Sequence, residues 1–214
     1  MLYRHHKKKL IIHASFVSKE RGSLIAKDLK ILKSKYGFTG IVSDGGTGIG
    51  NAIISIFGNI PHQICMAHLH RDIINAIGRY PKDERVKELK RIADHIWLIE
   101  SKEALRWWKD KLQKWSDKNR DFLDETKHLD TGGWWFIHKG VRKAARILVS
   151  LPDTSFKFLD HPLMPKTTNE LEGSISVLSR KHNLHKGLKR ERVKPFLQWF
   201  IYFYNRKILS QRKN

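Results

Sequence analysis

Ile41-Val42-Ser43-Asp44-Gly45-Gly46-Thr47-Gly48 places a carboxylate between a short apolar run and a glycine-rich turn. The apolar run predicts a short buried strand over residues 39–43, and the glycines after Asp44 predict a turn. A helix is predicted next, over residues 48–57. We therefore expect Asp44 at the carboxyl edge of a sheet, where open α/β sheets hold their functional sites.

The region before Asp44 has the pattern of an α/β protein. A β-rich run over residues 10–17 precedes a helical pattern that ends near Tyr36-Gly37. Strand, helix and strand in this order predict a parallel pair of strands joined by a right-handed crossover. Another strand is predicted over residues 62–66, after the helix that follows Asp44.

The middle of the chain, residues 81–160, is richer in charge and tryptophan and has few strand-like runs. Ser101 is a predicted helix N-cap, and the apolar residues after it are spaced by three and four, as on the buried face of an amphipathic helix. These residues are Leu105, Trp108, Leu112 and Trp115. The pattern predicts an all-helical segment. Two more helices are predicted after it, separated near residues 183–187, and the second has one aromatic face formed by Phe196, Trp199, Phe200 and Phe203.

A second candidate carboxylate, Glu172, lies in Thr167-Thr168-Asn169-Glu170-Leu171-Glu172-Gly173. An Asp after a strand and a Glu at a helix start provide oxygen ligands for divalent metals that serve phosphoryl transfer. Two simpler readings stay open: Asp44 as a turn residue, and Glu172 in a capping box with Asn169 as N-cap. Glu170 is an alternative to Glu172, because two residues along a helix are about 200° apart and cannot both face one site.

Four blocks of sequence occur in a fixed order along the chain. They are the Asp44 segment, Pro61-His62-Gln63-Ile64-Cys65-Met66-Ala67-His68, the Thr-Asn-x-x-Glu-Gly run that ends at Gly173, and Leu184-His185-Lys186-Gly187-Leu188. In this order and spacing the blocks resemble the DDE transposases of the IS256/Mutator superfamily, most closely its IS1249-like branch, from about Leu10 to Tyr204.

The resemblance implies a fold, a domain division and a cofactor. The fold is α/β, an RNase H-like mixed sheet with a helical insertion between the second Asp and the Glu. Residues 1–80 are expected to form the first part of the catalytic domain, 81–160 the insertion, and 161–214 the helices that complete the domain. Asp44 and Glu172 are the expected catalytic residues and metal ligands, holding Mg²⁺ or Mn²⁺, with two ions in the intact enzyme.

The resemblance also implies a third carboxylate, the first Asp of the family, in an Asp-Gly pair on the central strand. No Asp-Gly precedes Asp44, and the earlier acids are Glu20 and Asp28. Asp28 falls in a predicted helix and Glu20 after the second strand, so neither is a good substitute. We therefore expect an N-terminally truncated transposase fragment for metal-dependent DNA strand cleavage and strand transfer at insertion-sequence ends, inactive by itself. The alternative is a catalytically inactive DNA-binding remnant.

Cys65-x-x-His68, with His70 nearby, has the spacing of metal ligands. A structural zinc site usually takes four ligands with more than one cysteine, and this chain has one cysteine. A zinc-containing nucleic-acid-binding module is nevertheless a third reading, beside a buried structural cysteine. The resemblance implies that Cys65 and His68 are near-site residues without assigned chemistry.

The charge of the chain points to DNA as a partner. There are 42 Lys+Arg against 21 Asp+Glu, a net charge of +21, which favours phosphate contacts. The candidate DNA-binding residues are Arg180, Lys181, His182, His185, Lys186, Lys189, Arg190, Trp134 and Trp135. The simpler readings are a solvated helix end for the basic residues and core packing for the tryptophans.

Location and assembly follow from composition and from the resemblance. No apolar run is long enough to span a membrane, and one cysteine fits a reducing compartment. These features predict a cytoplasmic, nucleoid-associated protein without a membrane partner. The resemblance implies a homodimer on DNA.

Overall fold

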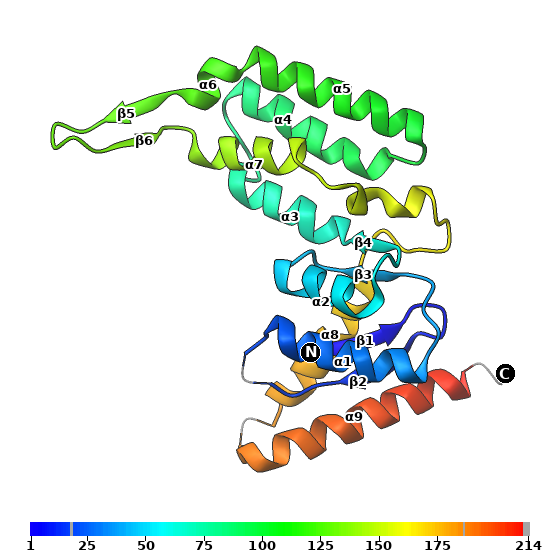
Figure 1. The fold of residues 1–214 in the computed structure, drawn as a ribbon. Coiled ribbons are helices and arrows are strands. Elements are labelled where there is room, and N and C mark those ends of the chain that lie inside the picture. The colour runs from blue at the N-terminus through cyan, green and yellow to red at the C-terminus, as the bar shows by residue number, and fades with distance from the viewer. Residues whose placement is uncertain (18, 186, 212–214) are drawn as a thin grey trace. The chain divides into compact units, whose positions relative to one another are not determined.

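The computed structural model describes residues 1–17, 19–185 and 187–211. The protein is mixed α/β, largely helical, with small sheets (Figure 1). It divides into two units: unit 1 contains Met1–His62 and Thr167–Asn214, and unit 2 contains Gln63–Lys166.

Unit 1 contains a two-stranded hairpin that is contacted by two helices. The strands β1 (Leu2–His5) and β2 (Leu10–Ala14) pair antiparallel. Helix α8 (Asn169–Asn183) contacts β1, and helix α9 (Arg190–Ser210) contacts β2. Chain segments far apart in the sequence are thereby joined in one unit.

Asn205 ties α9 to β2 by imitating a neighbouring strand. Its Oδ1 accepts a hydrogen bond from the Ile11 amide at 3.0 Å, and its Nδ2 donates to the Ile11 carbonyl at 2.8 Å. One side chain therefore satisfies both backbone groups of Ile11, which an exposed strand edge would leave to water or to another chain.

The rest of unit 1 is a helix pair with a short strand between its helices. Helices α1 (Gly22–Lys35) and α2 (Thr47–Phe57) pack their apolar faces together, and β3 (Ile41–Ser43) connects them. The buried residues of this small core are Ile25, Leu29, Ala52 and Ile53.

The predicted parallel pair of strands is wrong. In the described residues β2 pairs with β1, and β3 pairs with β4 (His62–Ile64), so β2 and β3 belong to different sheets. The physical reason is the main partner of α1: its apolar face packs largely against α2, whereas a parallel crossover would place it over a sheet that contains both β2 and β3. An RNase H-like mixed sheet therefore stays a prediction.

Unit 2 is a set of helices around one apolar core. Its longer helices are α3 (Met66–Ile77), α4 (Glu84–Asp94), α5 (Lys102–Lys118) and α7 (Lys139–Val149). The short ones are η1 (His95–Leu98), α6 (Arg120–Asp124) and η2 (Asp153–Leu159). At one point α3 and α7 approach so closely that only glycine fits, since a Cβ on Gly140 would lie 2.1 Å from the Ala76 carbonyl oxygen.

The predictions for α5 are confirmed. Ser101 is the N-cap, and its Oγ accepts a hydrogen bond from the Ala104 amide at 3.1 Å. Trp108, Leu112 and Trp115 are buried, and Leu105 packs against the same core. The buried indole of Trp108 donates to the Ile92 carbonyl at 2.7 Å, so burial leaves its N–H satisfied.

The segment 81–160 is not entirely helical. Strands β5 (Thr126–His128) and β6 (Trp134–Phe136) form an antiparallel hairpin that extends from α6 and α7 as an arm (Figure 1). Each strand has three residues, too few for an alternating pattern to be recognised in the sequence.

The aromatic face predicted for α9 is only partly covered. Phe196 and Phe200 are half-buried, whereas Trp199 is 61% exposed and Phe203 is 60% exposed. No helix in the described part of the chain combines the length and the apolar character needed to cross a membrane.

Candidate metal-binding and nucleic-acid-binding residues

Asp44 lies exposed in the turn that follows β3. Its Oδ1 accepts a hydrogen bond from the Gly46 amide at 3.3 Å, and Gly45 has a φ of +83°, a conformation that favours glycine. The Asp-Gly-Gly sequence therefore forms an Asx turn, which is closed by the Asp44 side chain and not by a backbone hydrogen bond. The turn presents the carboxylate to solvent, so its role in the turn and metal binding are compatible.

A hydrogen bond between neighbouring strands fixes the residue before Asp44. The buried Ser43 Oγ lies 2.8 Å from Nε2 of His62, and the Gly45 amide donates to the same Oγ at 3.4 Å. Burial lowers the pKa of His62, so its imidazole is neutral at neutral pH. This contact holds the carboxyl end of β3 without adding charge beside Asp44.

Glu172 lies in the first turns of α8 and is half-buried. Asn169, the predicted N-cap, is instead the first residue of the helix, and Thr168 takes the N-cap position. The Thr168 hydroxyl donates to Oε1 of Glu172 at 3.3 Å. Because the helix begins one residue earlier than the capping-box pattern requires, Glu172 is its fourth residue, and the predicted capping box is wrong.

Glu170, the alternative ligand, already forms ion pairs with the β1 hairpin. It forms an ion pair with Arg4, and His6 Nδ1 lies 3.7 Å from the same carboxylate oxygen. The hydrogen bond from Arg4 lowers the pKa of Glu170. Glu170 therefore holds α8 against β1, which favours Glu172 as the candidate ligand.

Asp28 is a structural residue on the buried side of α1. It accepts a hydrogen bond from Ser15 Oγ at 2.5 Å and pairs with Nε2 of His13 at 3.1 Å. Burial, together with the nearby charge of Asp28 and a hydrogen bond to it, raises the pKa of Tyr3. These contacts join the hairpin to α1 and leave Asp28 poorly placed to act as a third metal ligand, while Glu20 is exposed.

Asp44 and Glu172 both belong to unit 1. Within the described residues, no set of three clustered carboxylate, imidazole or thiol ligands includes Asp44. Carboxylate oxygens are ligands that hard cations prefer, so Asp44 and Glu172 stay candidate ligands.

Cys65 and His68 lie together at the start of α3 in unit 2. Cys65 is fully buried, His68 is half-buried, and the cysteine Sγ lies within 4.8 Å of a ring nitrogen of His68. His70 is engaged elsewhere, because its Nε2 lies 2.8 Å from Oδ1 of Asp94. The described part of unit 2 therefore does not assemble Cys65, His68 and His70 into one zinc site.

The basic candidates surround the end of α8. Arg180 and Lys181 are exposed in its last turn, His182 is half-buried there, and His185 and Lys189 follow it, both exposed. Lys186 and the side chain of Arg190 lie outside the described residues. Cations in the last turn of a helix also stabilise the helix itself, so a structural contribution accompanies any contact with phosphates.

The two tryptophans of β6 have different environments. Trp134 is 56% exposed, whereas Trp135 is half-buried, with the Lys139 ammonium 5.7 Å from its ring centre. In α5 the neighbouring pair divides as the apolar pattern predicts: Trp108 is buried and Trp107 is 58% exposed.

One basic surface was missed in the sequence. Four cations of α7 line a shallow groove together with Phe136, and they are Lys139, Arg142, Lys143 and Arg146. Their spacing of three and four residues is visible in Lys139-Gly-Val-Arg142-Lys143-Ala-Ala-Arg146. That spacing would have placed them on one side of a helix.

Comparison with known proteins gives a family. The model of the family described as "Transposase IS66 family" matches residues 6–191. No curated protein matches the chain.

The family match shows that the resemblance to the IS256/Mutator superfamily and its IS1249-like branch is wrong. Its blocks are short, and Asp-Gly turns and Thr-Asn-x-x-Glu runs are common, so their order did not separate one transposase family from another. With that resemblance removed, only local structure supports the candidate site residues, which are Asp44, Glu172, Cys65 and His68.

Proposed function

Because the chain belongs to the IS66 family of transposases, we propose that it is part of a transposase that acts by metal-dependent DNA strand cleavage and strand transfer at insertion-sequence ends. The observation that carries this proposal is the family match over residues 6–191. The net charge of +21 supports it, because the substrate is a polyanion.

The metal site is proposed at Asp44 and Glu172. DDE transposases use divalent metal ions, and hard cations such as Mg²⁺ or Mn²⁺ prefer carboxylate oxygens. Asp44 is exposed, so exchanging water for a cation costs little there, and Thr168 orients the carboxylate of Glu172. In two-ion catalysis the metals supply an activated attacking oxygen and a stabilised leaving oxygen.

The neighbouring residues would act by positioning these carboxylates. The Ser43–His62 hydrogen bond fixes the strand before Asp44. The Arg4–Glu170 ion pair anchors the start of α8, two residues before Glu172. The strand before Asp44 and the helix that carries Glu172 would thus each be held by a side-chain contact, as a site of fixed geometry requires.

DNA would be bound through cations and exposed aromatic rings, and the acting species would be a homodimer on DNA in the nucleoid. The proposed binding residues are those around the end of α8 and on β6, with Lys186 and Arg190 retained from the sequence. Phosphate contacts fix the position of the DNA, whereas they carry little sequence information. Replacing Arg180 and Lys181 with alanine should therefore weaken binding about equally for all sequences.

A second candidate function is a DNA-binding remnant without catalysis. It is favoured by the lack, in the described residues, of any ligand cluster of three that includes Asp44. Two cations about 4 Å apart repel each other strongly unless carboxylates surround them. On this reading the chain by itself binds DNA and does not cut it.

One experiment tests both functions. The chain is mixed with DNA carrying the ends of its own insertion sequence, with Mg²⁺ or Mn²⁺, and binding is measured between about 50 and 200 mM salt. We expect salt-sensitive binding and little cleavage. A longer protein with an upstream Asp-Gly pair should cut, and Asp44→Asn or Glu172→Gln should abolish cutting while Glu170→Gln retains part of it. Absence of DNA binding contradicts the function, and cutting that survives Asp44→Asn contradicts the site.

A further inference from the structure

Trp134 and Phe136 form a continuous aromatic surface on one face of the β5–β6 arm. Residues two apart on a strand point to the same face, and these two rings meet edge to face with centroids 5.2 Å apart. Trp134 is 56% exposed although its indole is a large and mostly apolar ring system. Trp135 points to the opposite face.

The aromatic surface leads into the basic groove of α7. Phe136 lines this groove beside Arg142, whose guanidinium lies 3.8 Å from the centre of the Phe136 ring. Arg142 is held in place by an ion pair with Asp124 and by a hydrogen bond to the Leu123 carbonyl at 3.2 Å. Arg142 therefore joins the arm to the helix and is a positioning residue of the groove.

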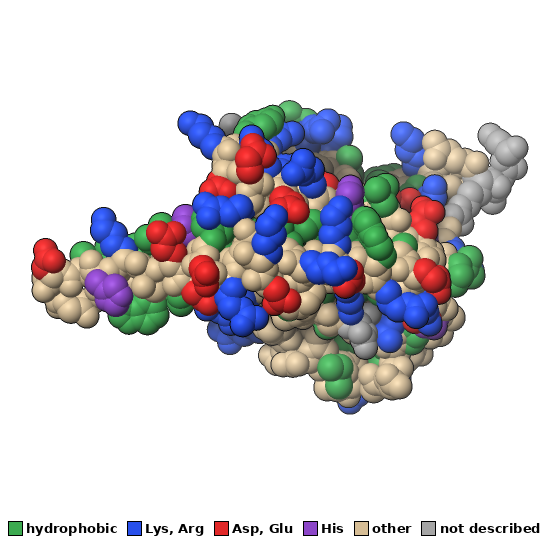
Figure 2. Space-filling view, turned by 90° about the horizontal axis from the view of Figure 1, so that it is seen from above, with side chains coloured by type: hydrophobic (Ala, Val, Ile, Leu, Met, Phe, Trp, Pro, Cys, Tyr) green, Lys and Arg blue, Asp and Glu red, His purple; other side chains and the backbone are tan. Residues whose placement is uncertain are grey.

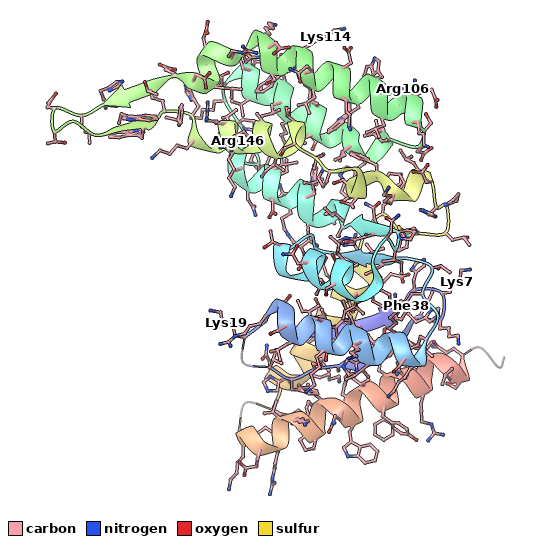
Figure 3. All side chains as sticks on the ribbon, in the orientation of Figure 1. Lys7, Lys19, Phe38, Arg106, Lys114 and Arg146 are labelled. Atoms are coloured by element: carbon pink, nitrogen blue, oxygen red, sulfur yellow. The ribbon has the colours of Figure 1, made fainter. Side chains whose placement is uncertain are left out.

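Of the other groove cations, Lys139 lies against the Trp135 ring, whereas Lys143 and Arg146 have no ring contact or ion pair among those the structure describes. Both are exposed on α7, three residues apart and so on one side of the helix (Figure 3 labels Arg146). Neither has a carboxylate partner among the described residues, and no acidic residue lines the groove. A groove of this kind attracts an anion that can run along it.

A second groove, on α5, shows that this is not simply the surface of a basic protein. It has three lysines but also Glu88 and Asp110, and Lys114 pairs with Asp110 at 2.8 Å. Figure 2, viewed from above the molecule of Figure 1, shows basic and acidic side chains interspersed over the visible face. The α7 groove therefore differs from the α5 groove in lacking acidic residues.

We propose that Trp134, Phe136, Lys143 and Arg146 form a site for a single-stranded DNA segment, called here the arm site. Lys143 and Arg146 contact successive phosphates, and an unpaired base stacks on Trp134. An exposed indole beside a cationic groove is the combination that binds single strands, because the face of an unpaired base is accessible whereas a duplex hides it. The proposal rests on the proposed function, since it names where on a DNA-binding protein an unpaired strand lies.

The experiment compares two labelled DNAs by fluorescence anisotropy: a blunt duplex, and the same duplex with an overhang of about 8 nucleotides, within the usual range for single-strand sites. The stacking variant is Trp134→Ala, with Trp107→Ala as its control, because Trp107 is exposed to nearly the same extent, 58% against 56%. The groove variant is Lys143→Ala with Arg146→Ala. Its control is Lys111→Ala with Lys114→Ala, which removes the same charge from the α5 groove.

Each variant has a defined expected result. Trp134→Ala should weaken binding of the overhang DNA about fivefold or more, and it should weaken blunt-duplex binding by a smaller factor. The groove variant should weaken overhang binding and reduce the salt slope by about 1.4, for two single-strand phosphate contacts. Both controls should change overhang binding by less than about twofold, as expected for surface changes outside the site.

Four results would overturn the proposal in distinguishable ways. Equal losses in the two double variants would show that net charge alone governs binding. Equal effects of Trp134→Ala and Trp107→Ala would exclude stacking on Trp134. If the unaltered chain binds neither DNA, the proposed function fails with the arm site, whereas strong duplex binding without a gain from the overhang contradicts the arm site alone.

Discussion

Replacing Asp28 with alanine should destabilise unit 1 strongly. The Asp28 side chain is buried on α1 and is the shared acceptor for Ser15, at 2.5 Å, and His13, at 3.1 Å. It also lies beside the hydroxyl of Tyr3. The substitution would leave these hairpin groups without the partner that joins them to α1.

The magnitude follows from the groups left behind. A buried polar group that loses its partner costs about 1–3 kcal/mol. His13 keeps 24% of its side chain exposed, so water recovers part of its loss. We therefore expect a total of about 3–5 kcal/mol for the Ser15, His13 and Tyr3 groups that lose their shared acceptor. That is a large share of the roughly 5–15 kcal/mol that stabilises a typical domain.

Urea unfolding with amide hydrogen exchange measures this loss and locates it. Protection should fall in β1, β2 and α1 and remain unchanged in α4 and α5 of unit 2. Asp28→Asn, which retains one acceptor oxygen, should lose less, and exposed Asp44→Asn should change stability little. If Asp28→Ala costs less than about 1 kcal/mol and instead abolishes Mn²⁺ binding, Asp28 is a metal ligand and the structural reading is refuted.

Three further predictions concern packing and pH. Gly140→Ala should lower the free energy of unfolding by at least the roughly 1–3 kcal/mol typical of overpacking, because its Cβ would lie 2.1 Å from the Ala76 carbonyl oxygen. The control is Gly50→Ala, which has open space around it and should be neutral or stabilising by up to about 1 kcal/mol. The raised pKa of Tyr3 favours the neutral phenol in the folded state, so its stabilising contribution is present below the ordinary value of about 10 and is lost as pH rises beyond it. Tyr3→Phe should therefore flatten the alkaline loss of stability measured by urea unfolding. Asn205→Ala removes two hydrogen bonds to β2 and should cost about 1–3 kcal/mol, with faster amide exchange at that strand edge, while equal exchange would contradict its anchoring role.

Local sequence patterns predicted individual helices and strands better than they predicted which of these elements pack or pair together. Ser101 and the Trp108 face of α5 were predictable because capping and helical periodicity are local properties. The pairing of β2 and β3 was not, because it depends on which surface covers α1, and the sequence does not show that α2 does so. The β5–β6 arm was missed because its strands are too short to show an alternating pattern.

The candidate site shows the same division. The turn at Asp44 was predictable from its glycines, and the structure places the carboxylate in solvent. The engagement of Glu170 by Arg4 was not predictable, because 165 residues separate the partners in the chain. Short motifs identified a transposase but assigned the wrong family, which only a match over residues 6–191 resolved.

The central claim, a shared metal site at Asp44 and Glu172, is tested most directly by Mn²⁺ titration of isotope-labelled protein followed by NMR. Bound Mn²⁺ broadens the signals of nearby amides. We predict that amides around Asp44 and around Glu172 broaden at the same Mn²⁺ concentration, and that either Asp44→Asn or Glu172→Gln removes the broadening at both places. Broadening at only one of the two segments, or broadening that survives both substitutions, would contradict the account.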